Sequence, residues 1–297
     1  MNINRIDYKN YKNEQGLSLA IGFFDGVHKG HRLIIKETLK DKSLIPAVLT
    51  FSLNMKIGME KKNSLLLTEE EKEEEIAKLG IREYFLLPFT EEVKHSSIEE
   101  FLDFLLRLNV REVIVGKDFT FANRGEGKAE ALKILEERRI KVRIIDLFFE
   151  EGDKVSSTRI KRLLEEGKIE EANELLGYSY YVQGKVIHGL ANGRKIGFPT
   201  ANIVVDKNLV HLPESVYKTE TVMEGHQFKS MTSIGKHPTI EELDESIIET
   251  NIIGFRGDIY GRNIKVVFKK LIRDQVKFQG LEELKVQLKK DQEDCSK

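Results

Sequence analysis

Two rhythms of hydrophobic and polar positions divide the chain. From residue 18 to about residue 176, short β-branched or aliphatic runs alternate with amphipathic stretches of helical length. This alternation is typical of βαβ units and predicts a parallel sheet flanked by helices. The expected strands are Ser18–Phe23, Ala47–Phe51, Glu83–Leu87, Glu112–Gly116 and Val142–Ile145. The expected helices are Arg32–Leu39, Thr68–Leu79, Ser97–Leu108, Gly127–Arg138, Ser157–Glu166 and Ile169–Leu176.

Beyond residue 180, strand-like runs follow one another with only turn residues between them. The expected strands are Val182–Ile187, Ile203–Val205, Val216–Val222, Ser230–Ile234, Ile247–Phe255 and Ile264–Leu271. A last helix, Leu281–Lys290, carries apolar residues at 281, 284 and 288, a spacing that packs one face onto the strands. The pattern predicts an α/β protein with two domains: residues 1–180 with a Rossmann-like sheet, then residues 181–297 as a small β-barrel with a C-terminal helix.

Local signals refine two helices of the first half. Thr68 and Ser97 precede two helical stretches and are suited to cap them. The acidic run Glu69–Glu75 has the composition of a solvated helix face, and we expect it to be exposed.

Composition narrows the class of protein. The 48 Lys and Arg nearly balance the 49 Asp and Glu, so no overall field favours a nucleic acid or an anionic membrane as partner. The single cysteine, Cys295, excludes an internal disulfide and a cysteine-built zinc site. No window approaches the length of a membrane span, and the N-terminus does not resemble a signal peptide. We therefore expect a cytoplasmic protein whose partners are small molecules.

The first candidate site follows the first expected strand, in the stretch Gly-Phe-Phe-Asp-Gly-Val-His-Lys-Gly-His at residues 22–31. A helix is expected to begin there, and its free N–H groups and dipole favour an anion. Gly26 and Gly30 permit close approach, while His28 and His31 can donate to phosphate oxygens. Two other interpretations stay open: a metal site with Asp25 as a third ligand, or two solvated or capping histidines.

The second candidate site is Gly-Arg-Lys-Ile-Gly-Phe-Pro-Thr-Ala-Asn at residues 193–202. It combines glycines, cations, a hydroxyl and an amide on the edge of the β domain. From the residues alone it is a weak anion site, and an ordinary hairpin connection explains it equally well.

These stretches resemble the bacterial riboflavin kinase/FMN adenylyltransferase family, also called FAD synthetases, within the His-x-x-His nucleotidylyltransferases. Two further stretches support the resemblance, Val-Gly-Lys-Asp-Phe-Thr-Phe at 115–121 and Val-Ser-Ser-Thr-Arg-Ile at 155–160. The resemblance covers almost the whole chain. It implies that riboflavin and ATP give FMN in the barrel, and that FMN and ATP give FAD in the α/β domain, with Mg²⁺ in both reactions.

For the α/β domain the resemblance implies three groups of site residues. The catalytic residues are His28, His31 and Arg159. The ATP-binding residues are Gly22, Phe24, Asp25, Gly26, Gly30, Ser156, Ser157 and Thr158. The flavin-binding residues are Asp118 and Phe119. An FMN phosphate oxygen attacks the α-phosphorus of ATP and pyrophosphate leaves, so positioning and charge neutralisation suffice without a covalent nucleophile.

For the barrel the resemblance implies a kinase site. ATP binds at Gly193, Lys195, Gly197, Pro199 and Thr200. Thr200 and Asn202 hold Mg²⁺ through hard oxygen donors. The riboflavin hydroxyl loses a proton as it attacks, and Glu249 is the expected base. Arg273 is expected near the flavin.

The sequence departs from the family pattern at several positions. Phe-Ser-Leu-Asn-Met at residues 51–55 stands where relatives commonly carry Pro-His-Pro. Ala122 and Ser215 stand where relatives commonly have Gly, Gly254 where they have Asp, and Gln275 where they have Glu. Three alternatives follow: an FAD synthetase whose barrel only binds flavin, a non-catalytic flavin-binding regulator, and a nucleotidyltransferase for another phosphate. The appended barrel argues against the last.

Overall fold

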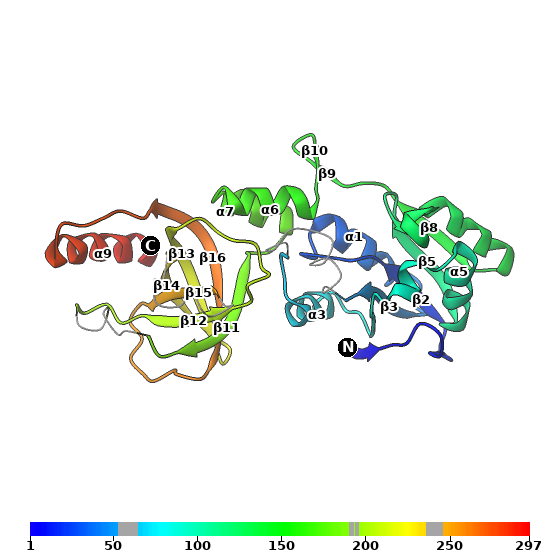
Figure 1. Cartoon of the computed structure of the whole chain (residues 1–297), viewed down its shortest axis with the longest axis horizontal. Coiled ribbons are helices and arrows are strands. Elements are labelled where there is room, and N and C mark those ends of the chain that lie inside the picture. Colours follow the sequence, from blue (N-terminus) through cyan, green and yellow to red (C-terminus); the bar gives the residue numbers. More distant parts are fainter. Residues whose placement is uncertain (53–64, 190–192, 194–195, 236–245) are drawn as a thin grey trace. The chain divides into compact units, whose positions relative to one another are not determined.

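The computed structural model describes residues 1–52, 65–189, 193, 196–235 and 246–297 (Figure 1). Contacts divide the chain into two compact units, residues 1–157 and residues 158–297, and each is described by itself. The first unit contains a parallel sheet and the second a closed antiparallel barrel. The predicted fold class, an α/β domain followed by a β-barrel with a C-terminal helix, is confirmed.

A six-stranded parallel sheet forms the centre of the first unit, in the order β1-β4-β3-β2-β5-β8. Its strands are β1 (Asn2–Arg5), β2 (Leu17–Ile21), β3 (Ile45–Phe51), β4 (Glu83–Leu87), β5 (Val110–Gly116) and β8 (Lys141–Ile145). The sequence pattern predicted all of these strands except β1, which is short and half exposed and so lacks a hydrophobic run. The order reverses between β2 and β5, and at such a switch point the loops beyond the strand ends separate to leave a crevice for ligands.

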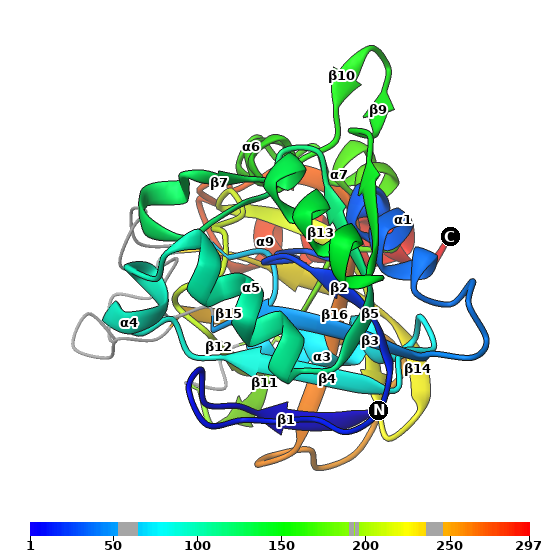
Figure 2. The same ribbon diagram turned by 90° about the vertical axis from the view of Figure 1, so that its right-hand side faces the viewer.

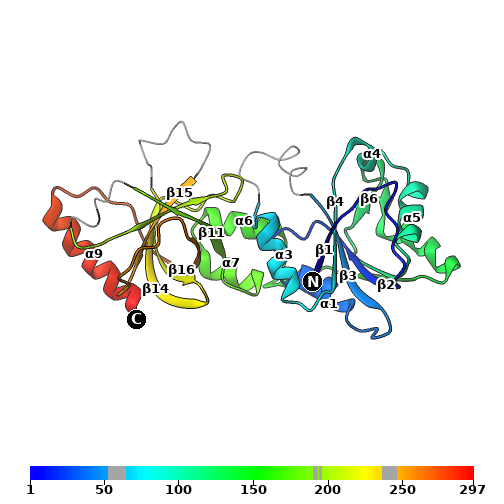
Figure 3. The ribbon, with the colours of Figure 1, turned by 90° about the horizontal axis from the view of Figure 1, so that it is seen from below.

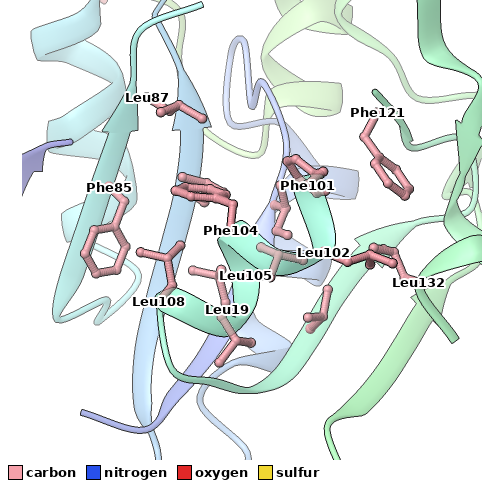
Figure 4. Packing of buried hydrophobic residues seen from close by; sticks show 14 of the residues in the cluster. Leu19, Phe85, Leu87, Phe101, Leu102, Phe104, Leu105, Leu108, Phe121 and Leu132 are labelled. Carbon is pink, nitrogen blue, oxygen red and sulfur yellow. The ribbon is translucent and has the colours of Figure 1, made fainter. Parts of the chain in front are cut away.

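Helices cover the sheet because their apolar stripes face it. They are α1 (Lys29–Glu37), α3 (Glu69–Ala77), the short α4 (Glu91–Lys94) and α5 (Ile98–Arg107). Helix α5 lies in front of the strands in Figure 2, and its residues Phe101, Phe104 and Leu105 are buried. Figure 4 shows these side chains packed with Leu19 and Phe85 of the strands. Thr68 and Ser97 cap α3 and α5 in capping boxes, as predicted.

The expectation that the acidic run is exposed holds for Glu70 and Glu74 but is wrong for the other face of α3. Glu71, Lys72 and Glu75 are all buried. Glu71 is buried because it bonds the backbone N–H of Thr68 in the capping box. Glu75 is buried because it pairs with Arg32 of α1 at 2.5 Å. Charge composition alone predicted solvent exposure, whereas pairing across elements allows these charges to be buried.

Shorter elements complete the first unit. They are β6 (Thr120–Phe121), η1 (Asn123–Gly125), β7 (Gly127–Lys128), η2 (Ala129–Arg138), β9 (Phe149–Glu150) and β10 (Asp153–Lys154). The helix expected at 127–138 is therefore present from residue 129, but as a 3₁₀ helix.

The second unit is a closed barrel with strand order β11-β12-β15-β14-β13-β16 (Figure 3). Its strands are β11 (Tyr181–Ile187), β12 (Ala201–Val205), β13 (Ser215–Met223), β14 (His226–Ser233), β15 (Ser246–Ile252) and β16 (Asn263–Asp274). Helix α9 (Leu281–Ser296) packs on β14 and β13. Leu288 lies against the core as expected, whereas Leu281, in the first turn, is 63% exposed.

Helices α6 (Ser157–Glu165) and α7 (Ile169–Leu176) precede the barrel, and α7 packs on β16. The Asn173 side chain connects α7 to β16, because it donates to the Phe268 carbonyl at 3.0 Å. It also accepts from the Tyr180 N–H at 2.6 Å. The contact boundary falls between residues 157 and 158, at the start of α6. The sequence pattern places the domain boundary after residue 180, and that division of function stays a prediction. None of the helices in the described part of the chain has the length and apolar composition that crossing a bilayer requires.

Candidate active sites

A strained turn joins β2 to α1 at the switch point of the sheet. Phe24, Gly26 and Val27 all have positive φ, at 52°, 79° and 38°. A Cβ on Gly26 would lie 2.5 Å from Leu66, so only glycine fits beneath the turn. The turn places His28 at the N-cap of α1, directly before the first helical residue, Lys29.

His28 caps α1, and this role fixes which of its ring nitrogens carries a proton. Its Nδ1 accepts the backbone N–H of His31 at 3.3 Å. A neutral imidazole has one donor and one acceptor nitrogen, so the proton is on Nε2. The rings of His28 and His31 stack with centroids 3.6 Å apart, and Phe24 meets His31 edge-on at 5.3 Å.

Burial keeps His28 neutral. The side chain is 5% exposed, and the loss of hydration lowers its pKa from 6.5 to about 4, against the opposing charge of Asp25. His28 therefore offers a hydrogen-bond donor without a charge at neutral pH. The capping interpretation and the phosphate-donor interpretation are compatible, because they use different nitrogens.

Asp25 supports this turn from within. It is 1% exposed, its carboxylate accepts the Leu66 N–H at 2.9 Å, and its carbonyl accepts the Ser157 hydroxyl at 2.9 Å. The structure therefore brings together Asp25, Gly26, His28, His31 and Ser157 of the predicted nucleotide site. Ser156 is half-buried in the same unit, while Thr158 and Arg159 are on α6 in the second unit.

An aromatic cavity of about 840 Å³ opens at the carboxyl ends of the strands. Its walls include Phe23, Phe51, Phe89, Phe101 and Phe121. Asp118 and Phe119, the predicted flavin contacts, are not on its wall: Asp118 pairs with Lys154 at 2.5 Å, and Phe119 stacks on Phe121 at 5.8 Å. The sequence analysis missed the wall, although Phe23, Phe51 and Phe89, at or just beyond the ends of expected strands, were a usable signal.

In the barrel, β12 and β15 bring two predicted residues together. Asn202 lies directly opposite Glu249 in the antiparallel register, so their side chains share one face. On the other face, Ala201 and Thr250 border a cavity of about 240 Å³, together with Thr200 just before the strand.

The loop before β12 is tightly turned. The Phe198 N–H bonds the Gly193 carbonyl at 2.8 Å, and a Cβ on Gly193 would overlap the Phe198 carbonyl. Gly197 has a φ of 90° and Pro199, exposed, accepts from the Asn251 amide at 2.7 Å. Lys195 lies outside the described residues.

Arg273, the predicted flavin contact of the kinase, forms a bidentate ion pair. Its Nε and Nη2 lie 3.0 Å and 2.7 Å from Oδ2 of Asp291 on α9. Asp291 is 1% exposed. The pair anchors α9 to β16, a role that the sequence analysis did not foresee because Asp291 is 18 residues away.

The donor atoms available at the two sites limit which metal ions they could bind. The described residues contain no group of three or more His, Cys, Asp or Glu that could hold a metal, so a histidine zinc site finds no complete ligand set there. A hydroxyl and an amide oxygen, as at Thr200 and Asn202, fit Mg²⁺ that is otherwise bound by water and phosphate.

The fold and the two sites define a two-domain, nucleotide-dependent transferase. An FAD synthetase family model matches residues 10–159, and a riboflavin kinase model matches residues 176–297. The chain belongs to the bifunctional riboflavin kinase/FMN adenylyltransferase family, as the resemblance predicted.

Individual relatives agree with the family models. A bifunctional riboflavin kinase/FMN adenylyltransferase of Listeria monocytogenes is 38% identical over 93% of this chain and 90% of its own length. Its Bacillus subtilis counterpart is 34% identical over 96% and 93%. A crystal structure described as a macrolide-efflux protein from Streptococcus pneumoniae has a TM-score of 0.88 and 31% identity, covering 98% of this chain and 97% of that one. The whole architecture is thus shared with a solved structure.

Proposed function

We propose that this enzyme phosphorylates riboflavin in its barrel and then adenylylates the resulting FMN at the histidine turn, with Mg²⁺ in both reactions. The observation that carries the proposal is His28: a buried, neutral histidine whose Nε2–H is left as a donor at the switch point of the sheet. Binding flavin alone requires no such donor, so this feature favours an enzyme over a flavin-binding regulator.

At the histidine turn, an FMN phosphate oxygen forms a bond to the α-phosphorus of ATP as the bond to pyrophosphate breaks. The attacking oxygen is already ionised, so no base is needed. His28 and His31 donate to the phosphate oxygens, and the N–H groups at the start of α1 add the positive end of the helix dipole. Asp25 and Ser157 hold the turn, while Ser156, Thr158 and Arg159 bind the nucleotide phosphates.

The aromatic cavity takes the isoalloxazine ring of FMN. Its phenylalanine walls suit stacking on a planar ring, and its volume of about 840 Å³ accommodates a molecule of that size. Phe23 belongs both to this wall and to the segment leading into the histidine turn, so a ring bound here brings the FMN chain toward His28. Asp118 and Phe119 act behind the wall in this proposal.

In the barrel, the riboflavin hydroxyl attacks the γ-phosphorus of ATP. Glu249 accepts the hydroxyl proton as the new P–O bond forms and ADP leaves. Thr200 and Asn202 would hold Mg²⁺, which neutralises phosphate charge when bound. The turn around Gly193 and Gly197 covers the nucleotide, and Lys195 and Pro199 contribute to the same loop. The functional domains of the proposal are residues 1–180 and 181–297.

Incubation of the purified chain with riboflavin, ATP and MgCl₂, followed by chromatographic separation of the flavins, tests both reactions. FMN should form first and FAD should follow. A parallel sample with EDTA should give neither product, because uncompensated phosphate charges repel the attacking oxygen.

The alternatives give different products in this assay. FAD from added FMN, without FMN from riboflavin, would identify an FAD synthetase whose barrel only binds flavin. No product from either flavin would favour a non-catalytic regulator. The near-zero net charge agrees with small-molecule partners. A cytoplasmic location is part of the proposal.

A further inference from the structure

A completely buried lysine lies beside the histidine turn. Lys72, on the inner face of α3, is 0% exposed, and no other lysine of the described residues is buried. Removing an ammonium group from water is strongly unfavourable unless hydrogen bonds and opposite charges compensate. The position therefore requires a specific explanation, which the packing of α3 alone does not supply.

Two contacts hold the ammonium group. Its Nζ lies 3.1 Å from a carboxylate oxygen of Glu69 and donates to the Thr50 hydroxyl at 3.3 Å. Glu69 also accepts from the Tyr84 hydroxyl at 2.5 Å, so its carboxylate is fixed from the sheet as well. Burial lowers the pKa of Lys72, and the carboxylates of Glu69, Asp25 and Glu73 oppose that shift.

Thr50 connects Lys72 to the proposed active site by hydrogen bonds. Its hydroxyl accepts from Lys72 and donates its own proton to the Phe23 carbonyl at 3.1 Å. Thr50 is the second-last residue of β3, and Phe23 lies two residues beyond the end of β2. Two hydrogen bonds thus connect the buried ammonium group to the backbone segment that leads into Asp25 and His28.

The same segment faces two substrates of the proposed reaction. The Phe23 side chain is on the wall of the aromatic cavity, and the strained turn begins at the next residue, Phe24. The Asp25 carboxylate, buried beneath the phosphate site, would repel a triphosphate, and the Lys72 charge offsets it. Lys72 is therefore placed to act on both the geometry and the potential of the site.

We propose that Lys72 is a positioning residue for adenylyl transfer, holding the Phe23 carbonyl through Thr50 and so fixing the turn that presents His28 to the nucleotide. This inference rests on the proposed function of the α/β domain. It requires no contact between Lys72 and either substrate.

The test compares Lys72→Met, Thr50→Val and the double variant with the unmodified enzyme. Each single change should lower kcat/KM for FAD formation from FMN about 10-fold or more, because displaced catalytic groups react poorly. Since both residues act through one chain, the double variant should be no worse than Lys72→Met. Thr50→Ser, which keeps the hydroxyl, should retain more activity than Thr50→Val.

Two controls separate positioning from folding. Lys78→Met removes an exposed lysine that pairs with Glu75 at 2.5 Å near the end of the same helix, and it should leave FAD formation unchanged. FMN formation from riboflavin by the same samples should stay within about twofold, because that reaction uses the barrel. Thermal unfolding shows the folded fraction, to which all rates are normalised.

Several outcomes would overturn the inference. It fails if Lys72→Met has the same kcat/KM for FAD formation as the unmodified enzyme. If Lys72→Met does not fold, the same result for Thr50→Val overturns the inference. It also fails if the two effects multiply in the double variant, since independent residues would not share one chain. An unmodified enzyme that makes no FAD would instead refute the proposed function, which keeps the two failures distinct.

Discussion

His28 caps α1 through one ring nitrogen, and we propose that the other donates to the nucleotide; conservative substitutions can separate the two tasks. In His28→Asn the amide oxygen replaces Nδ1 as the cap acceptor, but the donor at Nε2 is lost. We expect little change in stability and about a 100-fold loss of FAD formation. In His28→Gln the amide reaches the Nε2 position but no longer caps the helix. This variant should lose about 1 kcal/mol of stability and retain more activity.

Steady-state FAD formation and thermal unfolding of the two variants provide the measurements. Equal activity losses in both, at unchanged stability, would contradict the division of tasks between the two nitrogens.

The depressed pKa of His28 also predicts how stability depends on pH. The unfolded chain binds a proton at this histidine below about pH 6.5, whereas the folded chain does so only near pH 4. Lowering the pH between these values therefore favours the unfolded state, and the free energy of unfolding falls by up to about 3 kcal/mol from this residue. Its contribution is constant above pH 6.5.

Urea unfolding between pH 4 and pH 7 would measure this effect. In His28→Asn the slope over that range should be smaller, because Asn does not titrate. An unchanged slope would show that other groups cause the pH dependence.

Ala122 has a strained backbone conformation, at a position where the family resemblance led us to expect glycine. Its φ of 64° and ψ of −174° fall in a region that glycine adopts freely and that costs other residues about 1–3 kcal/mol. The strain agrees with the expectation of glycine at this position. We expect Ala122→Gly to stabilise the protein by about 1 kcal/mol, less than the full strain because glycine also makes the unfolded chain more flexible.

Thermal unfolding measures that gain. Ala131→Gly, in the 3₁₀ helix η2, is the matched control and should lower the stability. A lower midpoint for Ala122→Gly would mean that the backbone is not strained at this residue.

At the scale of elements, α9 depends on the ion pair between Arg273 and Asp291. Asp291→Asn removes the charge but keeps the shape, and Arg273 is left only 18% exposed without its partner. Breaking a buried pair from one side typically costs about 3 kcal/mol or more. We therefore expect a lower unfolding midpoint and faster proteolysis within α9.

Asp294→Asn is the matched control, because Asp294 pairs with Lys297 at 2.8 Å on the exposed side of the same helix. It should leave the midpoint unchanged. If both variants behaved alike, Arg273 would not be the anchor of α9, and its predicted role at the flavin would gain weight. A raised KM for riboflavin in Asp291→Asn would show that the anchor also orders the kinase site.

At the scale of the whole molecule, the two sites should be separable. His28→Ala should lower the rate of FAD formation about 100-fold and leave the rate of FMN formation unchanged. Glu249→Ala should do the reverse, because a lost general base typically costs about 100-fold or more. Flavin products are measured from riboflavin and from FMN for each variant. Loss of both reactions in one folded variant would contradict the assignment of separate sites.

Much of the fold was predictable because it depends on local signals. Alternation and helical periodicity predicted the strands of the barrel and those of the sheet except β1, and Thr68 and Ser97 predicted two helix starts. The burial of Lys72 and Glu75 was not predictable, since it depends on partners in other elements. Arg32 and Thr50, for example, lie far from α3 in the sequence.

The candidate sites divide in the same way. The motif residues indicated an anion site near His28 and a polar site near Asn202, and family resemblance supplied the substrates. The register between Asn202 and Glu249, the aromatic wall and the pairing of Arg273 came only from the structure, because each joins residues from different strands or helices.

By itself, the sequence determined the two-domain α/β and barrel architecture, the capped helices and the family, since these follow from periodicity and from residue types at fixed spacing. The tertiary structure decided which charges are buried, that burial keeps His28 neutral, and where Lys72 acts. Those properties arise from desolvation and from contacts between residues distant in the chain, and no local pattern records them.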